Sequence, residues 1–318
     1  VIKRAAPVYP QTELRRTREA WVLVSYCIDE EGVPQNLSVL DSAGSSNFER
    51  AALAAARRWR FKPAELGGKP SWQSNNQTYI TFAIGGLGKG ASRSFIRDYR
   101  RLGKLIESGD LDEAEELFQR LHANEDLNLY ELSRLWTQRV SYELARGDYY
   151  KADLAIHRAT ASDGVWIEEK SYAALLVVRI SIELHLGHYA AVFGAYDTLV
   201  DVAGAESEQA QSLLPTIEEL RRMVDSDNII QTNAEVRRRG ECYRCNDSYS
   251  FTPVRRSFTF DNVNGELASI ELRCTHKRFE SAISDRVEWT IPDSWGGCSI
   301  QVYGEPGTTF EVLQFPDG

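Results

Sequence analysis

Four of the five cysteines in this 318-residue chain lie in its last quarter, at Cys242, Cys245, Cys274 and Cys298. Thiols at this spacing could form a redox-active dithiol, a zinc site or structural disulfides. A redox dithiol needs a thiolate at a helix N-terminus, but the C-x-x-C pair precedes a predicted strand. A zinc site would pair that knuckle with two cysteines that are not C-x-x-C. Disulfides fit only an oxidising compartment, so the choice depends on where the protein works.

The remaining candidates for chemistry give weak signals. His185 and His188 are three residues apart and could ligate a metal from one helix face. We find no acidic or thiol partner for them nearby, so we expect solvated or capping roles. We see no nucleophile–base motif, phosphate-binding loop or pair of catalytic acids. The sequence therefore predicts no enzyme activity, no metal and no cofactor. The other histidines are His122, His157 and His276.

Composition indicates a soluble chain with real cores, because 42% of its residues are hydrophobic and 26% are charged. No apolar run reaches the roughly 18 residues that a membrane span needs. The net charge of -9 arises mainly in the middle segment, and no basic stripe indicates nucleic acid. The chain begins at Val1 rather than at Met, so we expect any signal peptide or membrane anchor to precede it.

Residues 1–84 have the pattern β-β-α-β. Strands are predicted at 20–29, 33–40 and 77–84, with a turn at "DEEG" between the first two. Between them, "FERAALAAARRWRFKPA" (48–64) places alanines and aromatics on one helical face and ends at Pro63. Ser46 and Glu49 are predicted to form a capping box. The segment should be an antiparallel sheet covered by one helix.

A glycine-rich stretch, 85–92, is predicted to be a linker, and residues 93–228 are predicted to be helical. Gly109, Gly147 and Gly187 recur at intervals of 38 and 40 residues, which is typical of stacked helical hairpins. The pattern resembles tetratricopeptide repeats, although their usual period is about 34 residues. We therefore expect degenerate repeats of this type.

Residues 229–318 return to alternating hydrophobicity. Strands are predicted at 249–260, 266–274, 285–291, 298–304 and 308–315, with a hairpin turn at Asn264–Gly265. This number of short strands favours a small β-sandwich or barrel. The expected fold class is thus multidomain α+β, with a β-β-α-β domain, a helical repeat domain and an all-β domain.

The first segment resembles the C-terminal domain of the TonB family of periplasmic energy transducers. The resemblance rests on "PVYP" (7–10), "EAWVLVSYCIDEEGVPQNLSVLDS" (19–42), "FERAALAAARRWRFKPA" (48–64), "GGKP" (67–70) and "QTYITFAI" (77–84). It covers about a quarter of the chain. Ala6 departs from a glutamine found in an enteric member, and the family domain usually ends its protein, whereas more than 200 residues follow here.

The resemblance implies a periplasmic protein that binds the TonB box, an extended peptide of an outer-membrane transporter, by adding it to the last strand. It also implies an inner-membrane motor of the ExbB–ExbD type, and the helical repeats would recruit a further partner. A scaffold without transducing activity is the alternative. The implied contact residues are Tyr9, Pro10, Ser74, Asn75, Asn76, Gln77, Thr78, Tyr79 and Thr81.

Trp59, Arg60 and Phe61 could form an aromatic–cationic binding surface, but we favour a structural role in which Trp59 ends the apolar face of the helix and Phe61 packs under the sheet. With Phe48 and Pro63 they are a signature of the domain and not its site. The implied periplasm is oxidising, which favours disulfides. The pairs expected are Cys242–Cys245 and Cys274–Cys298, although four cysteines allow three connectivities. Cys27, inside a strand, is expected to be a buried free thiol.

Overall fold

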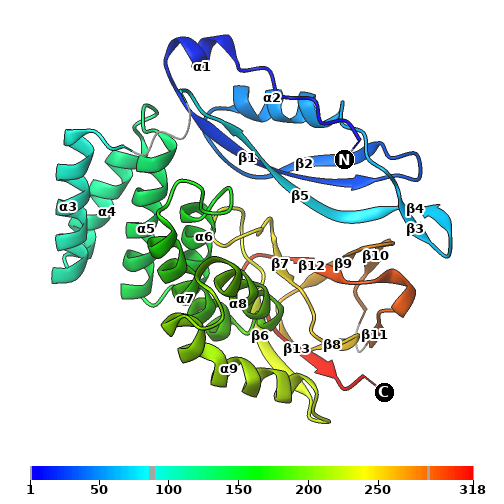
Figure 1. The fold of residues 1–318 in the computed structure, drawn as a ribbon. Coiled ribbons are helices and arrows are strands. Elements are labelled where there is room, and N and C mark those ends of the chain that lie inside the picture. The colour runs from blue at the N-terminus through cyan, green and yellow to red at the C-terminus, as the bar shows by residue number, and fades with distance from the viewer. Residues whose placement is uncertain (1, 86–89, 285–286, 318) are drawn as a thin grey trace. The chain divides into compact units, whose positions relative to one another are not determined.

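The computed structural model describes residues 2–85, 90–284 and 287–317, and its ribbon is shown in Figure 1. The chain divides into two compact units. The first comprises residues up to 72 together with 76–168, and the second comprises 73–75 together with 169–318. The predicted linker at 85–92 lies partly outside the described residues. No helix in the described part of the chain combines the length and apolar character needed to cross a bilayer.

The N-terminal part of the first unit is a three-stranded sheet in the order β2-β1-β5. β1 and β2 are antiparallel. Helix α2 packs against both of them. The α+β class predicted for this segment is confirmed, with two additions, a one-turn helix α1 and a small hairpin β3–β4. The elements are α1 (Gln11–Arg15), β1 (Ala20–Ile28), β2 (Pro34–Ala43), α2 (Ser46–Ala56), β3 (Ala64–Leu66), β4 (Lys69–Ser71) and β5 (Gln73–Phe82).

Aromatic rings fill the space between α2 and the sheet. Trp59 is 2% exposed, and its indole N–H donates to the carbonyl of Ala5 at 2.9 Å. Phe61 stacks on Tyr26 with ring centroids 5.4 Å apart. Phe48 lies in the same core. These residues therefore pack as the structural interpretation expected.

The capping box predicted at Ser46 and Glu49 is wrong. Ser45 is the N-cap of α2, its side chain makes no capping hydrogen bond, and Ser46 is already helical. Glu49 instead accepts a hydrogen bond from the Ser42 hydroxyl at 2.6 Å. The Ser46 hydroxyl accepts from Arg50, one turn along the same helix, at 3.2 Å, so neither group forms the cap that the local motif predicted.

Two helical hairpins complete the first unit. They are α3 (Arg93–Ser108) with α4 (Leu111–His122), and α5 (Leu129–Ala145) with α6 (Tyr149–Ala159). Gly109 and Gly147 have φ of 82° and 72°, so glycine is required at both turns. The hairpins agree with the periodicity, while their kinship with tetratricopeptide repeats stays a prediction.

The second unit joins three helices to two antiparallel sheets. The helices are α7 (Glu169–Leu186), α8 (Tyr189–Ala203) and α9 (Glu208–Val224). The four-stranded sheets have the orders β10-β9-β12-β7 and β11-β8-β13-β6. The strands are β6 (Ile230–Glu235), β7 (Ser248–Phe251), β8 (Ser257–Asn264), β9 (Leu267–Cys274), β10 (Arg278–Ala282), β11 (Trp289–Thr290), β12 (Cys298–Gly304) and β13 (Thr309–Phe315).

The two sheets meet through aromatic side chains. Tyr249 of β7 lies edge-on to Phe310 of β13 at 5.7 Å, and Phe251 of β7 lies edge-on to Phe258 of β8 at 5.9 Å. Such interdigitation is typical of a sandwich. The disulfides are Cys242–Cys245 and Cys274–Cys298, the latter between β9 and β12, and Cys27 is a buried free thiol.

A buried arginine fastens α9 to the β-sheets. Arg255 is 3% exposed and donates to the carbonyl oxygens of Met223 and Val224 at 3.0 Å, both in the last turn of α9. It also donates to those of Ser226 at 2.6 Å and Gln314 at 3.3 Å. A cation at a helix C-terminus satisfies carbonyls that the helix itself leaves unpaired.

The turn between β1 and β2 generates a first prediction. Gly32 has φ of 78°, and a Cβ there would lie 2.0 Å from the carbonyl oxygen of Phe61. Gly32→Ala should therefore lower the free energy of unfolding by about 3 kcal/mol, from backbone strain and a steric clash together. Gly67 has φ of 59° with open space around it, so Gly67→Ala should cost only about 1 kcal/mol. Urea denaturation of both variants compares the costs, and equal losses would contradict the close approach.

The buried Arg255 generates a second prediction. Arg255→Met should lower the free energy of unfolding by about 3 kcal/mol or more, because several buried carbonyls lose their donor. The neighbouring Arg256 is a matched control, since its side chain is 39% exposed and pairs with the exposed Asp293. Arg256→Met should cost less than about 1 kcal/mol. Circular dichroism during denaturation measures both, and similar stabilities for the two variants would show that Arg255 does not hold α9.

Candidate functional site

The residues expected to bind a peptide lie on β5, at the end of the three-stranded sheet (Figure 1). β1 is the neighbour of β5 on one side, and among the described residues the sheet order gives it no neighbouring strand on the other. An edge strand of this kind presents main-chain N–H and C=O groups that another strand can pair with. The location of the site at a sheet edge is thus compatible with strand addition.

Side chains on β5 alternate between two environments. Thr78, Ile80 and Phe82 point towards the α2 core: Ile80 and Phe82 belong to that core, and the Thr78 hydroxyl lies 3.2 Å from that of Tyr26. Tyr79 and Thr81 have the opposite orientation. Tyr79 lies edge-on to Trp21 at 5.6 Å, and the Thr81 hydroxyl is 3.2 Å from that of Ser162. Because these side chains have partners within the chain, the backbone is the part of β5 suited to recognition.

The first residues of β5 have a different environment. Gln73–Asn75 belong to the second compact unit, where the main-chain N–H of Ser74 donates to the carbonyl of Thr275 at 3.0 Å. The Asn75 side chain accepts a hydrogen bond from Ser299 at 3.1 Å. The first residues of the predicted site are therefore engaged within the second unit.

Tyr9 is more deeply anchored than its predicted contact role requires. Its ring lies edge-on to Phe48 and Phe82 at 5.7 and 5.6 Å, and its hydroxyl donates to the carbonyl of Arg18. Burial, with the negative charges of Glu19 and Glu13, raises the pKa of Tyr9 to about 12. Tyr9 thus stays a neutral hydrogen-bond donor and fixes the segment before α1. Pro10 is the N-cap of α1.

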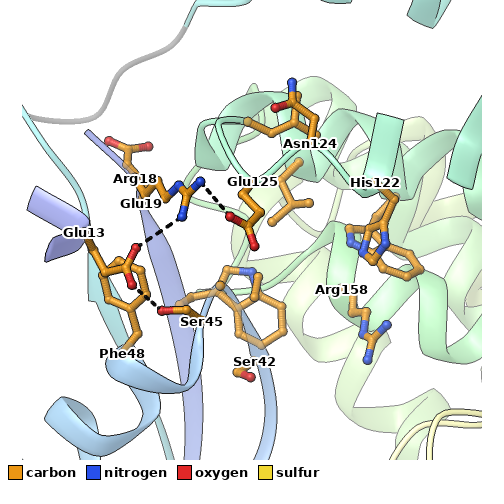
Figure 2. Close-up of a pocket in the computed structure, with 16 residues that line it drawn as sticks. Glu13, Arg18, Glu19, Ser42, Ser45, Phe48, His122, Asn124, Glu125 and Arg158 are labelled. Atoms are coloured by element: carbon orange, nitrogen blue, oxygen red, sulfur yellow. Dashed lines mark hydrogen bonds and ion pairs between the residues drawn. The ribbon is translucent and has the colours of Figure 1, made fainter. Parts of the chain in front are cut away.

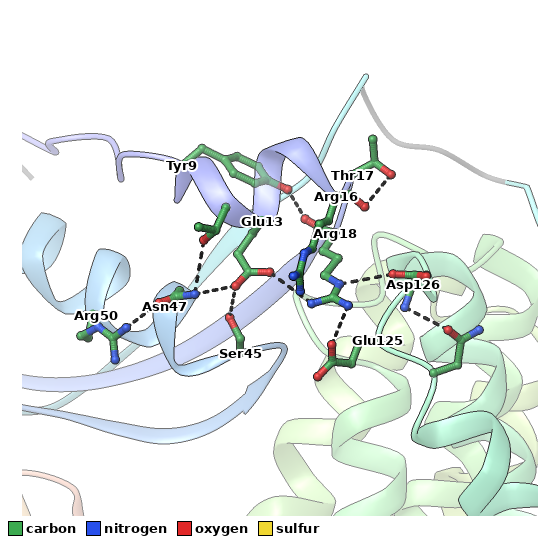
Figure 3. Close-up of polar contacts among 12 residues, drawn as sticks. Tyr9, Glu13, Arg16, Thr17, Arg18, Ser45, Asn47, Arg50, Glu125 and Asp126 are labelled. Carbon is green, nitrogen blue, oxygen red and sulfur yellow. Dashed lines mark hydrogen bonds and ion pairs between the residues drawn. The ribbon is translucent and has the colours of Figure 1, made fainter.

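A buried carboxylate holds α1 against the start of α2. Glu13 accepts hydrogen bonds from the Ser45 hydroxyl at 2.7 Å and from the Asn47 amide at 2.6 Å (Figure 3). These hydrogen bonds, assisted by the charge of Arg18, keep the pKa of Glu13 below its usual value despite burial. Glu13 is therefore a carboxylate at neutral pH.

Arg18 and Glu19 connect this domain to the helices of the same unit. The Arg18 guanidinium pairs with Glu125 at 2.6 Å and with Asp126 at 3.2 Å, both in the loop before α5 (Figure 3). Glu19 accepts the main-chain N–H of Ile84, just after β5, at 2.8 Å and that of Leu129, at the start of α5, at 3.1 Å. One carboxylate thus holds the end of β5 and the beginning of a helix.

A second connection leads from β2 to α6. Nε and Nη2 of Arg158 donate to the two carboxylate oxygens of Asp41, each at 2.9 Å. The guanidinium also lies over the ring of Trp136, 4.7 Å from its centroid. Bidentate pairs of this kind are the stronger and more directional ion pairs. Burial and the nearby Arg158 lower the pKa of His122, so that its ring is neutral at pH 7.

Sequence reasoning missed these connecting residues. Glu13, Arg18 and Glu19 lie between the Tyr-Pro motif and the first strand, in a stretch of charges that we did not interpret. The density of charge just before a fully apolar strand was the available signal. Sequence reasoning also missed the acidic partner of His188. In the second unit, a carboxylate oxygen of Glu183 lies 2.8 Å from the His188 ring.

The N-terminal segment matches known proteins. Residues 5–84 match the family model of the Gram-negative bacterial TonB protein C-terminal domain. Protein tonB2 of Pseudomonas aeruginosa is 38% identical over 64 residues, which are 20% of this chain and 24% of that protein. Protein TonB of Yersinia enterocolitica is 32% identical over 85 residues, which are 27% of this chain and 31% of that protein.

The chain spans between a quarter and a third of the length of these curated relatives. A solved structure of the TonB2 protein from Vibrio anguillarum is 33% identical, and the match covers 24% of this chain and 74% of that one with a TM-score of 0.21. The family model falls on the residues whose motifs carried the resemblance. Residues 5–84 of this chain form a TonB C-terminal domain, as those motifs predicted.

Proposed function

We propose that this chain is part of a periplasmic TonB-family protein. In this proposal its N-terminal domain recruits an outer-membrane transporter by taking up an extended peptide, the TonB box, beside β5. The peptide adds as a fourth strand, so that main-chain hydrogen bonds supply affinity and alternate side chains set the register. The work of the protein is then binding and mechanical coupling, not catalysis.

One observation carries the proposal: the family match over residues 5–84 coincides with a sheet whose last strand ends the strand order. An edge left open is a liability that proteins usually cover or shorten. Here β5 is ten residues long. A long edge in a domain of this family is accounted for by a partner strand.

The two connections to the helices support a second candidate function, that of a scaffold without transducing activity. Glu19 and the Arg158–Asp41 pair join the domain to α5 and α6, as a scaffold would require. As a transducer, the protein would pass load from β5 to the helices through the same side chains, with an ExbB–ExbD-type motor upstream. Upstream coding sequence separates the two, since a membrane-spanning helix with a proline-rich spacer supports transduction and a cleavable signal peptide supports the scaffold.

Proline substitution tests strand addition directly. Successive N–H groups of an edge strand point alternately towards the neighbouring strand and away from it. Of Thr78→Pro and Thr81→Pro, which lie three residues apart, one should therefore lose a hydrogen bond within the sheet and the other a donor needed only by the peptide. The variant that loses only the donor for the peptide should unfold at close to the wild-type urea concentration. It should bind a TonB-box peptide about tenfold more weakly or worse.

Isothermal titration calorimetry with the TonB box of a transporter from the same bacterium measures the affinity, and a scrambled peptide is the control. Wild-type affinity in every folded proline variant would exclude β5 as the docking edge.

A further inference from the structure

A cavity of about 310 Å3 lies inside the first unit, between the TonB C-terminal domain and the helices (Figure 2). Its walls come from the start of β1, the corner between β2 and α2, and helices α4 to α6. This volume is at the lower end of the range of small-molecule sites in proteins. Nothing in the proposed strand addition uses it.

Negative charge exceeds positive charge around this cavity. Glu13, Glu19 and Glu125 line it together with Arg18 and Arg158. Asp126 and Asp41 pair with the two arginines. The seven groups comprise five carboxylates and two guanidiniums, so their sum is -3 at neutral pH.

Both guanidiniums are already occupied by carboxylates. Arg18 is shared among Glu13 at 3.7 Å, Glu125 at 2.6 Å and Asp126 at 3.2 Å. Arg158 is held by Asp41. An anionic ligand would therefore meet cations that are neutralised and carboxylates that repel it.

One carboxylate oxygen in the wall has no hydrogen-bond donor. Glu13 is 4% exposed, and its Oε1 takes both hydrogen bonds from Ser45 and Asn47. Within the described part of the chain, Oε2 has no hydrogen bond, and its one ion-pair partner is the Arg18 guanidinium at 3.7 Å. A buried charged oxygen in this condition is costly unless a donor reaches it.

Aromatic side chains form another part of the lining. Trp21, Phe48 and Trp136 line the cavity with exposures of 3%, 1% and 7%. The ring of His122 completes this wall (Figure 2) and is neutral for the reason given above. Aromatic faces attract cations and also cover the apolar body of a ligand.

We propose that this cavity binds a small organic cation, an ammonium or amidinium group on an aromatic or short aliphatic body. The cationic head donates to Oε2 of Glu13, and the body lies among Trp21, Phe48 and Trp136. Such a ligand supplies the donor that the buried carboxylate lacks and reduces the negative charge of the wall. Because the walls belong to both the domain and the helices, the bound cation also links them.

Three probes of nearly equal size test the charge requirement. Benzylamine, benzyl alcohol and benzoate carry a positive, a neutral and a negative head on the same ring. Benzylamine should perturb the indole resonances of Trp21 and Trp136 in NMR titration, with a dissociation constant of about 1 mM or below. Benzyl alcohol should bind at least about tenfold more weakly, and benzoate weaker still. Equal binding of the three, or no binding of benzylamine at about 20 mM, overturns the proposal.

Glu13→Gln tests the named oxygen, because glutamine keeps the shape and can still accept from Ser45. Its affinity for benzylamine should fall about tenfold or more. Glu116→Gln is the matched control, since Glu116 is an exposed residue of α4 that does not line the cavity, and it should bind as the wild type does. Equal affinity in the two variants overturns the assignment of Glu13.

If Glu13→Gln does not fold, Glu125→Gln tests the effect of the negative charge around the cavity. The Glu125 side chain is 68% exposed, so its charge can be removed without opening the core. Its affinity should fall about threefold, and an unchanged affinity counts against the site. The capped tripeptide acetyl-Gly-Lys-Gly-amide distinguishes the source of the cation. Tighter binding of the tripeptide than of benzylamine assigns the head group to a lysine of a partner protein, and weaker binding assigns it to a free amine.

Discussion

The ion pair between Arg158 and Asp41 is the constraint on which the first unit depends. It joins α6 to β2 with two hydrogen bonds of 2.9 Å, and the side chains are only 22% and 15% exposed. Removing one partner of such a pair leaves the other charge without compensation in a partly buried place, which costs more than the pair itself contributes. The stack on Trp136 fixes the guanidinium plane, so that the same contact also shapes the cavity wall. The domain and the helices are consequently held at a polar contact whose geometry is specific.

The β-β-α-β order of the first segment could be predicted from sequence because each element carries its own period and its own terminator. Pro63 and the aromatics near it identify the end of the helical segment, and the structure ends α2 at Ala56, a few residues earlier. The helix α1 and the β3–β4 hairpin were missed, since five and three residues are too short to show a period. In the last segment, the stretch predicted as one strand at 249–260 is two, β7 and β8, which belong to different sheets. An uninterrupted alternation does not reveal where the chain crosses between sheets.

The candidate site, like the fold, could be predicted from sequence only in part. β5 could be named from sequence because a family motif ends on it. The cavity could not, because Glu13 and Trp136 are more than 100 residues apart and only the fold brings them to one wall. Tyr9 illustrates the intermediate case. Its motif was recognised, but its hydrogen bond to Arg18 and its packing on Phe82 depend on where α1 turns the chain.

If the protein transduces force as proposed, a load on β5 would have two routes into the helices, and they begin on different strands. One runs through Glu19, whose carboxylate accepts from Ile84, two residues after the end of β5, and from the first turn of α5. The other runs from β1 to β2 through their ladder and then through Asp41 to α6. Both links are charge-assisted hydrogen bonds, which are shorter and stronger than neutral ones. Their strength nevertheless depends on local charge, and the wall they share has a surplus of carboxylates. A cation bound there would tighten the junction through which the proposed load would pass, so that the two proposed activities meet at one set of side chains.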